Sequence, residues 1–372
     1  MFFRTNALRR LSGVFALLVV CMVVALATFQ VSHKAHAQSS GNFQASTISI
    51  NQYTLPGGDI DPWGTAVDSK GNVWVAVPGC NAAPTCPTNT PPGRLAVFNP
   101  TTNQWINVYQ LPNGYTQALF LAFDKQGMVW FALPMANAIG RFNPTNHTFQ
   151  KWTVPTASSG PWDVAIDGNG NVWFTEHYTN EIGRFNPTNH TFIKVQTPAT
   201  NSQPYGITVD ASNNVWFTEN NPSVALIAEY TTAGKLLEYK IRNSYNSALT
   251  PHLITLDHSG NVWWSEGFAG MLGKLKISSA VPGTNSGVKE FAYPISGSSG
   301  THTSGIGVDS TGLIWFDDAL QDTVGYFALS TKTWKINNTL PSNSHPHDGL
   351  TVDKSNRIWF DEEFANSLGK AV

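Results

Sequence analysis

Histidines and carboxylates gather in the last third of the chain, in segments that suit acid–base or metal chemistry. His252, His302, His345 and His347 all precede or begin a short apolar segment that leads to a Trp. An imidazole can accept a proton near neutral pH and can also bind a metal ion. Each histidine taken alone could equally be a loop hydrogen-bonding group. Several of them beside carboxylates favour an acid–base or metal site.

A sequence repeat predicts how these residues are positioned. Seven times an Asp precedes a Trp by six positions, from Asp68 and Trp74 to Asp353 and Trp359. Steps in the forties and fifties, with β-branched and aromatic runs and Asp-x-x-Gly-Asn turns, are typical of propeller blades. We therefore predict an all-β fold, a seven-bladed β-propeller of four-stranded antiparallel blades.

The two ends of the chain predict how the ring closes. Residues 47–55 resemble the fourth strand of a blade but come before the first full repeat, whereas the last repeat stops after a third strand at Ser367–Lys370. Pairing these two segments would remove the open sheet edges. We expect residues 47–372 to form one domain that the N-terminal strand closes. A closed ring needs no partner for its stability, so we expect a monomer.

Two positions of the repeat vary between units and suggest a binding surface. Three residues after the Trp stand Val77, Leu133, Glu176, Glu219, Glu266, Asp318 and Glu362. Five residues before the repeat Asp stand Trp63, Leu119, Trp162, Tyr205, His252, Ser304 and Asp348. Since neighbouring inner strands are antiparallel, both positions should surround one mouth of the central channel, which would be acidic and partly aromatic. The alternative is that the recurring acid, like the seven Trp, is architectural.

The N-terminal residues 1–37 are typical of a signal peptide. Basic residues precede an apolar run over 11–29, and Ala35–Ala37 matches a small-x-small cleavage site. An uncleaved anchor over 11–29 is the alternative. Both interpretations place the rest of the chain, which begins with a polar linker over 38–46, outside the cytoplasm. We expect a secreted or extracytoplasmic protein with no membrane contact beyond this segment.

The cysteines bear on the compartment of the protein, and its charge bears on the partners that it can bind. Cys80 and Cys86 enclose five residues of the insertion 78–93, and in an oxidising compartment we expect them to form a disulfide rather than half of a metal site. The net charge of −2, with 12% charged residues and no basic stripe, makes nucleic acid an unsuitable partner.

The repeat motifs resemble those of the streptogramin B (virginiamycin B) lyases. Pro251–Thr255 reads Pro-His-x-Ile-Thr, Trp173–Glu176 reads Trp-Phe-Thr-Glu, and Asn180–Arg184 reads Asn-x-Ile-Gly-Arg. The resemblance covers residues 47–372. It implies a seven-bladed propeller acting as a carbon–oxygen lyase, which opens the lactone of a cyclic depsipeptide by elimination with the help of Mg²⁺.

The resemblance also implies roles for individual residues. His347 corresponds to the general base, with one extra residue in the spacing, and Glu362 to a Mg²⁺ ligand. Where the family has a second acidic ligand this chain has His345, a poorer ligand for a hard cation. His302 is the nearest substitute for a substrate-binding histidine of the preceding blade. His252 and Glu266 keep the family's spacing one blade earlier, and with Trp162 and Tyr205 they would contact the substrate.

The proposed chemistry is consistent with these residue types. Elimination removes a proton next to a carbonyl, which needs a base such as His, and a cation would stabilise the charge that develops on oxygen. Two other functions stay open on the sequence alone. One is a non-catalytic exported propeller that binds a cationic peptide or a glycan, and the other is a divalent-metal lactonase, for which calcium with Asn and Asp ligands would be typical.

Overall fold

The computed structural model describes residues 48–58, 61–80, 86, 92–243, 249–294 and 300–372. All of them belong to one compact unit, Gly41–Val372. The predicted signal peptide over 1–37 and the linker over 38–46 lie outside the described residues. Within the described ranges, no helix has the length and apolar character needed to cross a membrane.

The described residues form seven four-stranded antiparallel sheets, which confirms the predicted fold. Blades one to three comprise β2 (Thr65–Val67), β3 (Val73–Val77), β4 (Arg94–Asn99) and β5 (Gln104–Gln110); β6 (Leu121–Phe123), β7 (Val129–Leu133), β8 (Ala138–Asn143) and β9 (Thr148–Thr153); and β10 (Pro161–Ile166), β11 (Val172–Glu176), β12 (Glu181–Asn186) and β13 (Thr191–Gln196). Blades four and five comprise β14 (Pro204–Val209), β15 (Val215–Glu219), β16 (Leu226–Tyr230) and β17 (Leu236–Lys240); and β18 (Pro251–Leu256), β19 (Val262–Glu266), β20 (Met271–Leu275) and β21 (Val288–Ala292).

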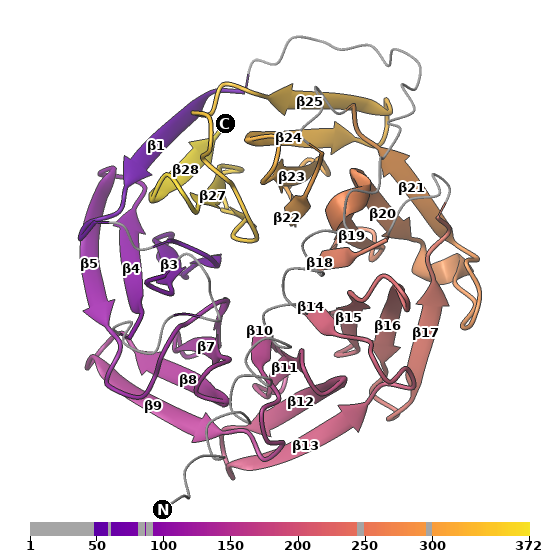
Figure 1. Cartoon of the computed structure of the whole chain (residues 1–372), viewed down its shortest axis with the longest axis horizontal. Helices are drawn as coiled ribbons and strands as arrows, with labels where there is room; N and C mark the ends of the chain where they lie inside the picture. The colour runs from indigo at the N-terminus through magenta and orange to yellow at the C-terminus, as the bar shows by residue number, and fades with distance from the viewer. Residues whose placement is uncertain (1–47, 59–60, 81–85, 87–91, 244–248, 295–299) are drawn as a thin grey trace, which may run out of the picture. The chain divides into compact units, whose positions relative to one another are not determined.

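Blade six comprises β22 (Thr303–Val308), β23 (Ile314–Asp318), β24 (Thr323–Ala328) and β25 (Thr333–Asn337). Blade seven comprises β26 (Thr351–Val352), β27 (Ile358–Glu362), β28 (Ser367–Ala371) and the N-terminal strand β1 (Ile50–Thr54). Two short 3₁₀ helices, Gly267–Ala269 and Ile277–Ser279, are the helical elements of the described part. The first strand of each blade lies near the central axis and the fourth at the periphery (Figure 1).

The predicted ring closure is confirmed. Strand β1 pairs antiparallel with β28 from Ile50 opposite Ala371 to Thr54 opposite Ser367. The last blade thus takes its outer strand from the start of the chain, and Figure 1 shows the two ends of the coloured ribbon side by side in that blade. Every backbone hydrogen bond in this pair ties together residues more than 300 positions apart.

The repeated Asp and Trp hold the innermost hairpin of every blade. In all seven blades the indole Nε1 of the Trp donates to Oδ2 of the Asp, at 2.8–3.1 Å. The other carboxylate oxygen of each Asp accepts backbone N–H groups two and four residues later, as in Asp167 with Asn169 and Asn171. The Trp side chains are buried. Both residue types are therefore structural, as the sequence indicated.

A second repeated contact fixes the start of the first strand of a blade, where the variable residues lie. The hydroxyl two residues after the Trp donates to the backbone of the next blade: Thr175 to Tyr205, Thr218 to His252 and Ser265 to Ser304, at 2.6–2.8 Å. These bonds position three residues around the central axis. In blades six and seven the same place is taken by Asp317 and Asp361.

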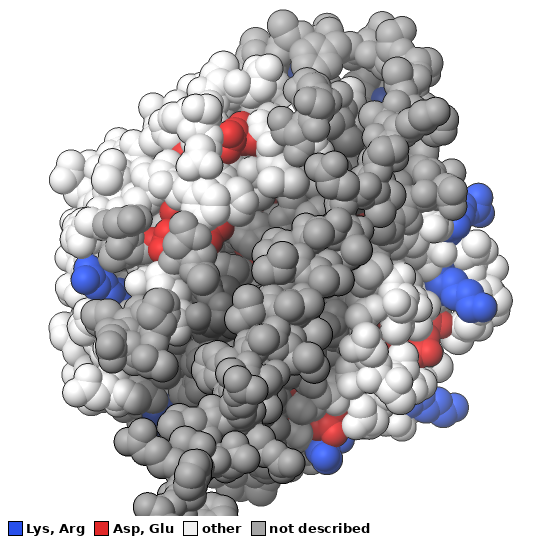
Figure 2. All heavy atoms as spheres, viewed as in Figure 1, with Lys and Arg blue, Asp and Glu red and all other residues white. Residues whose placement is uncertain are grey.

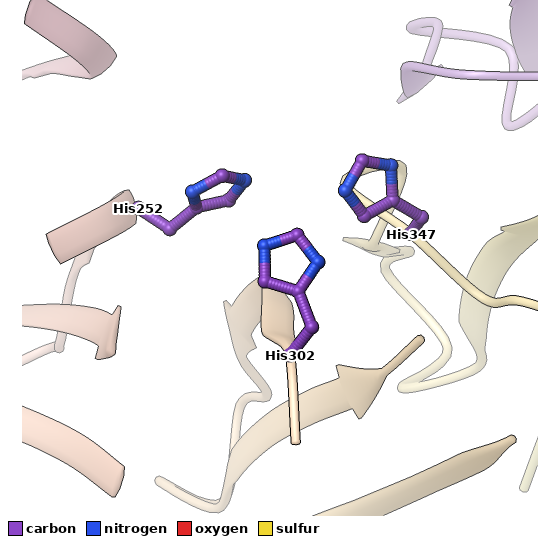
Figure 3. Close-up of side chains that lie close together, drawn as sticks. All are labelled: His252, His302 and His347. Atoms are coloured by element: carbon purple, nitrogen blue, oxygen red, sulfur yellow. The ribbon is translucent and has the colours of Figure 1, made fainter. Parts of the chain in front are cut away.

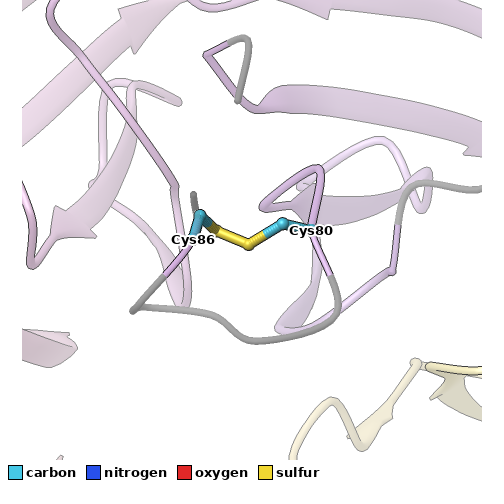
Figure 4. Close-up of a disulfide and its surroundings, with 2 residues drawn as sticks. All are labelled: Cys80 and Cys86. Atoms are coloured by element: carbon cyan, nitrogen blue, oxygen red, sulfur yellow. A yellow bond between two sulfur atoms is a disulfide. The ribbon is translucent and has the colours of Figure 1, made fainter. Parts of the chain in front are cut away.

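The insertion of the first blade carries Cys80 and Cys86. The structure joins Cys80 to Cys86 by a disulfide with the Cα atoms 5.7 Å apart (Figure 4). The bond closes a short loop on the chain between β3 and β4. On the face shown in Figure 2, described Lys and Arg side chains are scattered around the periphery, without a continuous basic patch.

Candidate functional site

Three imidazoles from three blades meet near the central axis. His252 belongs to β18, His302 directly precedes β22, and His347 precedes β26. The ring of His302 lies 5.0 Å from each of the other two rings, and the rings of His252 and His347 lie 6.0 Å apart. In Figure 3 the three side chains point toward one another. The structure therefore brings together three histidines that are separated by up to 95 positions in the sequence.

A buried carboxylate lies among these histidines. Asp348 is 2% exposed, and its oxygens accept hydrogen bonds from Tyr205 at 2.6 Å and Ser304 at 3.1 Å. His252 Nε2 lies 3.0 Å from Asp348 Oδ1. Burial by itself would raise the pKa of Asp348, but the neighbouring His347 and His252 and the hydrogen bond from Tyr205 outweigh it and hold the pKa well below its ordinary value. Asp348 is thus an anion at the centre of the site.

The turn that carries His347 departs from the pattern of blades three to six. In blade five the innermost strand β18 begins at Pro251, directly before His252, whereas in the last blade β26 starts only at Thr351, four residues after His347. His345 and Asp348 both adopt a positive φ, and Gly349 N donates to His347 O at 2.7 Å. Positive φ is uncommon for non-Gly residues in general, and Asn, Asp and His are the types that adopt it most readily. This tight turn replaces the first part of the strand and directs Asp348 toward Tyr205.

Glu363, rather than the predicted Glu362, is the carboxylate beside the histidines of this turn. Glu363 Oε2 lies 2.8 Å from His345 Nδ1 and 3.7 Å from His347 Nδ1. The neighbouring Glu362 points along the other face of β27, is fully buried and accepts a hydrogen bond from Gln52 of β1. Glu362 is the last residue of β27 and Glu363 is the first residue of the turn that follows, and the two carboxyl groups have different partners. The sequence signal for Glu363 was only its place at the end of an acidic run.

Two of these imidazoles, His302 and His347, have a lowered pKa, which favours their neutral form at neutral pH. Burial lowers the pKa of His347, and the opposing effects of Asp348 and Glu363 do not cancel this shift. Burial also holds the pKa of His302 well below its ordinary value, with the neighbouring histidines adding to the effect. A neutral imidazole has a free lone pair on one nitrogen, which can accept a proton or bind a metal.

Aromatic side chains form the opposite wall of the site. The ring of Tyr205 stacks on His252 at 4.0 Å, and Trp162 lies 5.3 Å from Tyr205. Trp63 presents its edge to His347 with the centroids 5.1 Å apart. Trp63 Nε1 is buried and has no hydrogen-bond acceptor among the described residues. Two residues predicted to bind substrate, Trp162 and Tyr205, therefore lie at the site, and Trp63 offers a free donor.

The recurring acids after the Trp do not line an open mouth as we expected. Glu176, Glu219, Glu266, Asp318 and Glu362 are all at most 1% exposed. Two of them are held by neighbouring side chains of the fold: Glu266 accepts from Trp264 Nε1 at 2.5 Å, and Asp318 accepts from Tyr293 and Thr301. Burial raises the pKa of Glu266 to about 8 and that of Glu362 to about 6. These contacts favour the architectural alternative for the repeat-wide acid.

Comparison with known proteins gives the family. The model of the virginiamycin B lyase family matches residues 104–372. The chain belongs to this family. Among solved structures, the virginiamycin B lyase of Staphylococcus aureus superposes with a TM-score of 0.74 at 25% identity, covering 87% of this chain and 99% of that one. The catalytically inactive variant of that enzyme with Quinupristin gives the same values.

More distant structures share only the fold. The extracellular domain of a putative one-component system from B. thetaiotaomicron has a TM-score of 0.64 at 14% identity, covering 88% of this chain and 40% of that one. A search among curated proteins gave no match. Membership of the virginiamycin B lyase family therefore rests on the family model together with the solved lyases.

The residues of the site do not fit the Mg²⁺ ion that the resemblance implied. The described groups that could surround one ion are His252, His302 and His347, and His345, His347 and Glu363. Mg²⁺ prefers six oxygen ligands in octahedral geometry. The two sets together contain four histidines and only one carboxylate, that of Glu363. We assign no step of the chemistry to Mg²⁺.

Proposed function

We propose that this protein is an extracytoplasmic carbon–oxygen lyase that opens the lactone ring of a cyclic depsipeptide by elimination. Three features support the proposal: membership of the virginiamycin B lyase family, a neutral histidine at the central site, and an adjacent aromatic wall. The observation that carries it is the position of His347, a buried imidazole with lowered pKa between Asp348 and Glu363.

The chemistry assigns His347 the role of base. Its neutral imidazole removes the proton from a carbon next to a carbonyl, a carbon–carbon double bond forms, and the ester C–O bond on the adjacent carbon breaks to release a carboxylate. No water is consumed. Glu363 and Asp348, 3.7 Å and 3.9 Å from His347 Nδ1, would stabilise the imidazolium that results. Trp63 Nε1 can donate to the carbonyl oxygen on which negative charge develops.

The substrate side of the proposal uses the remaining site residues. Trp162 and Tyr205 present rings against which an apolar cyclic peptide can pack, and His302 and His345 are partly exposed beside His347. Since a relative's structure contains Quinupristin, a streptogramin of that type is a reasonable first substrate to test.

The mass of the product tests this function. The purified full chain is incubated with the cyclic depsipeptide, and the product is analysed by mass spectrometry. We expect a ring-opened product with the mass of the substrate and a new carbon–carbon double bond. A product heavier by one water would show hydrolysis and favour the lactonase. Retention of intact ligand with no turnover would contradict the enzyme and favour a binding protein.

The extracytoplasmic location rests on residues 1–37 and has its own test. We expect the mature protein, recovered after expression with its natural N-terminus, to begin at Gln38 and to fractionate outside the cytoplasm. N-terminal sequencing of the exported protein measures this. A start at Met1 in the membrane fraction would instead support the anchor over 11–29.

A further inference from the structure

We propose that His252, His302 and His347 form a binding site for one divalent transition-metal ion that prefers imidazole ligands, such as Zn²⁺ or Co²⁺. The inference goes beyond the proposed lyase function, because it concerns a different ion and a ligand set that spans three blades. It rests on the geometry of the three rings and on the side chains that surround them.

The three imidazoles converge as ligands of one ion would. One nitrogen from each ring can be chosen so that all three lie within 4.8 Å of one another. In a tetrahedral zinc site with Zn–N bonds of about 2.0–2.1 Å the nitrogens are about 3.4 Å apart, so small side-chain rotations complete the site. In Figure 3 the nitrogens of His252 and His347 that are farther from the backbone face the space between the rings.

The carboxyl group of Asp348 lies directly beside this cluster. Its Oδ1 atom is 3.0 Å from His252 Nε2, and its Oδ2 atom is 3.9 Å from His347 Nδ1. Nε2 of His252 is buried and makes no well-oriented hydrogen bond among the described residues. A metal ion held by the three rings would therefore lie close to this carboxyl group.

The ring nitrogen of His347 that points away from the cluster, Nδ1, lies near a carboxylate, as is usual for a histidine that binds metal. Its Nδ1 atom is buried without a hydrogen bond and lies 3.7 Å from Glu363 Oε2. Histidines that bind metal commonly donate their other ring N–H to a carboxylate, which fixes the tautomer. A small movement of either side chain would complete that bond. The stacking of His302 on Phe268, with centroids 4.7 Å apart, holds the second ring in place.

Metal binding is measured on the full chain after chelation and removal of any affinity tag that contains histidine. Equilibrium dialysis against Co²⁺ or Zn²⁺, followed by elemental analysis, gives the stoichiometry, and the visible spectrum of Co²⁺ reports four-coordinate imidazole ligation. We expect one ion per chain and no displacement by millimolar Mg²⁺. His252→Ala and His302→Gln should each weaken binding by more than about tenfold.

Matched variants separate this site from other histidines. His190→Asn changes an exposed turn residue with positive φ, which Asn tolerates, and should bind the ion as the wild type does. His345→Asn and Glu363→Gln test the other ligand set. The proposal is overturned if the wild type binds no ion, or if these two variants lose the ion while His252→Ala and His302→Gln keep it. His302 is partly exposed, so its variant keeps the test informative if His252→Ala does not fold.

The result is independent of the lyase proposal. Dialysis and the Co²⁺ spectrum need no substrate, so failure of the elimination assay leaves the metal site standing, and the reverse also holds. If both proposals are right, an ion on His347 blocks its lone pair, and stoichiometric Co²⁺ should slow turnover until a chelator restores it. Faster turnover with Co²⁺ would contradict the joint account.

Discussion

The chemistry of this protein depends on how single side chains differ from their counterparts in other blades. The position that holds Trp63, Leu119 or Trp162 in earlier blades holds His252 and Asp348 in later ones. All of these residues converge on the axis because the repeat fixes the start of each first strand. The ring of equivalent positions around the axis therefore carries aromatic side chains in the earlier blades and ionisable side chains in the later ones.

The hydroxyl that links neighbouring blades shows the same principle. Thr175, Thr218 and Ser265 each accept a backbone N–H and donate to the next blade. Asp317 occupies this position in blade six, accepts the N–H of Gly305 at 2.7 Å, and leaves Oδ2 without a partner among the described residues. Burial raises the pKa of Asp317 to about 8. A raised pKa means that the folded protein holds this proton more tightly than the unfolded chain does.

The stability contributed by Asp317 should therefore fall as the pH rises. It is fully present below about pH 4, the ordinary range of a carboxyl, and is lost as the pH passes the folded-state pKa of about 8. We expect Asp317→Thr, which restores the residue type of blades three and four, to be more stabilising at pH 9 than at pH 5. The difference should exceed about 1 kcal/mol, since one pKa unit corresponds to about 1.4 kcal/mol. Denaturant unfolding at the two pH values measures it.

Thr218→Ser provides the control at the equivalent position of blade four, because it keeps the hydroxyl and adds no titrating group. Its effect on the free energy of unfolding should be the same at pH 5 and pH 9. An Asp317→Thr variant that gains no stability at pH 9 relative to pH 5 would show that Asp317 is not held as a neutral acid.

Among the elements, β1 and the turn before β26 matter most. Strand β1 supplies the outer edge of the blade that carries His345, His347 and Glu363, and Gln52 of β1 donates to Glu362. The turn over 345–349 replaces the first part of an inner strand and presents His347 and Asp348 to the axis. One element closes the fold and the other builds the site, both within the last blade.

Deletion of residues 38–56 should destabilise the protein far more than an ordinary terminal truncation. The deletion removes the five residue pairs between β1 and β28 and the buried Leu55. We expect a loss of at least about 3 kcal/mol in the free energy of unfolding, because the hydrogen bonds of a whole paired strand and a core leucine are lost together. Thermal or denaturant unfolding measures it. Deletion of 38–46 alone is the control, and equal stability of the two truncated proteins would be incompatible with closure by β1.

At the scale of the whole molecule, the fold was predictable because the same blade motif occurs seven times in the sequence. The Asp–Trp spacing, the turn residues and the spare strand at 47–55 each follow from local rules, and together they give the blade number and the closure. The convergence of Trp162, Tyr205 and His252 was also predictable, since equivalent positions of a closed ring must meet at its axis.

The details of the site were less predictable because they depart from the repeat. Only the fold shows that His347 lies in a tight turn, since Asn, Asp and His residues occur throughout this chain and their presence alone does not locate such a turn. The position of Glu363 beside His345 follows from the turn after β27, which the repeat pattern does not describe. Burial of the recurring acids depends on packing between blades, which the spacing of residues does not reveal.

The turnover of a His347→Gln variant tests the central claim most directly. The account predicts a loss of about 10²–10⁴-fold in the rate of elimination, because Gln fills a similar space but cannot act as the base. Circular dichroism should show the same fold as the wild type. Turnover within a few-fold of the wild-type rate by a correctly folded His347→Gln protein would contradict the assignment of His347 as the base.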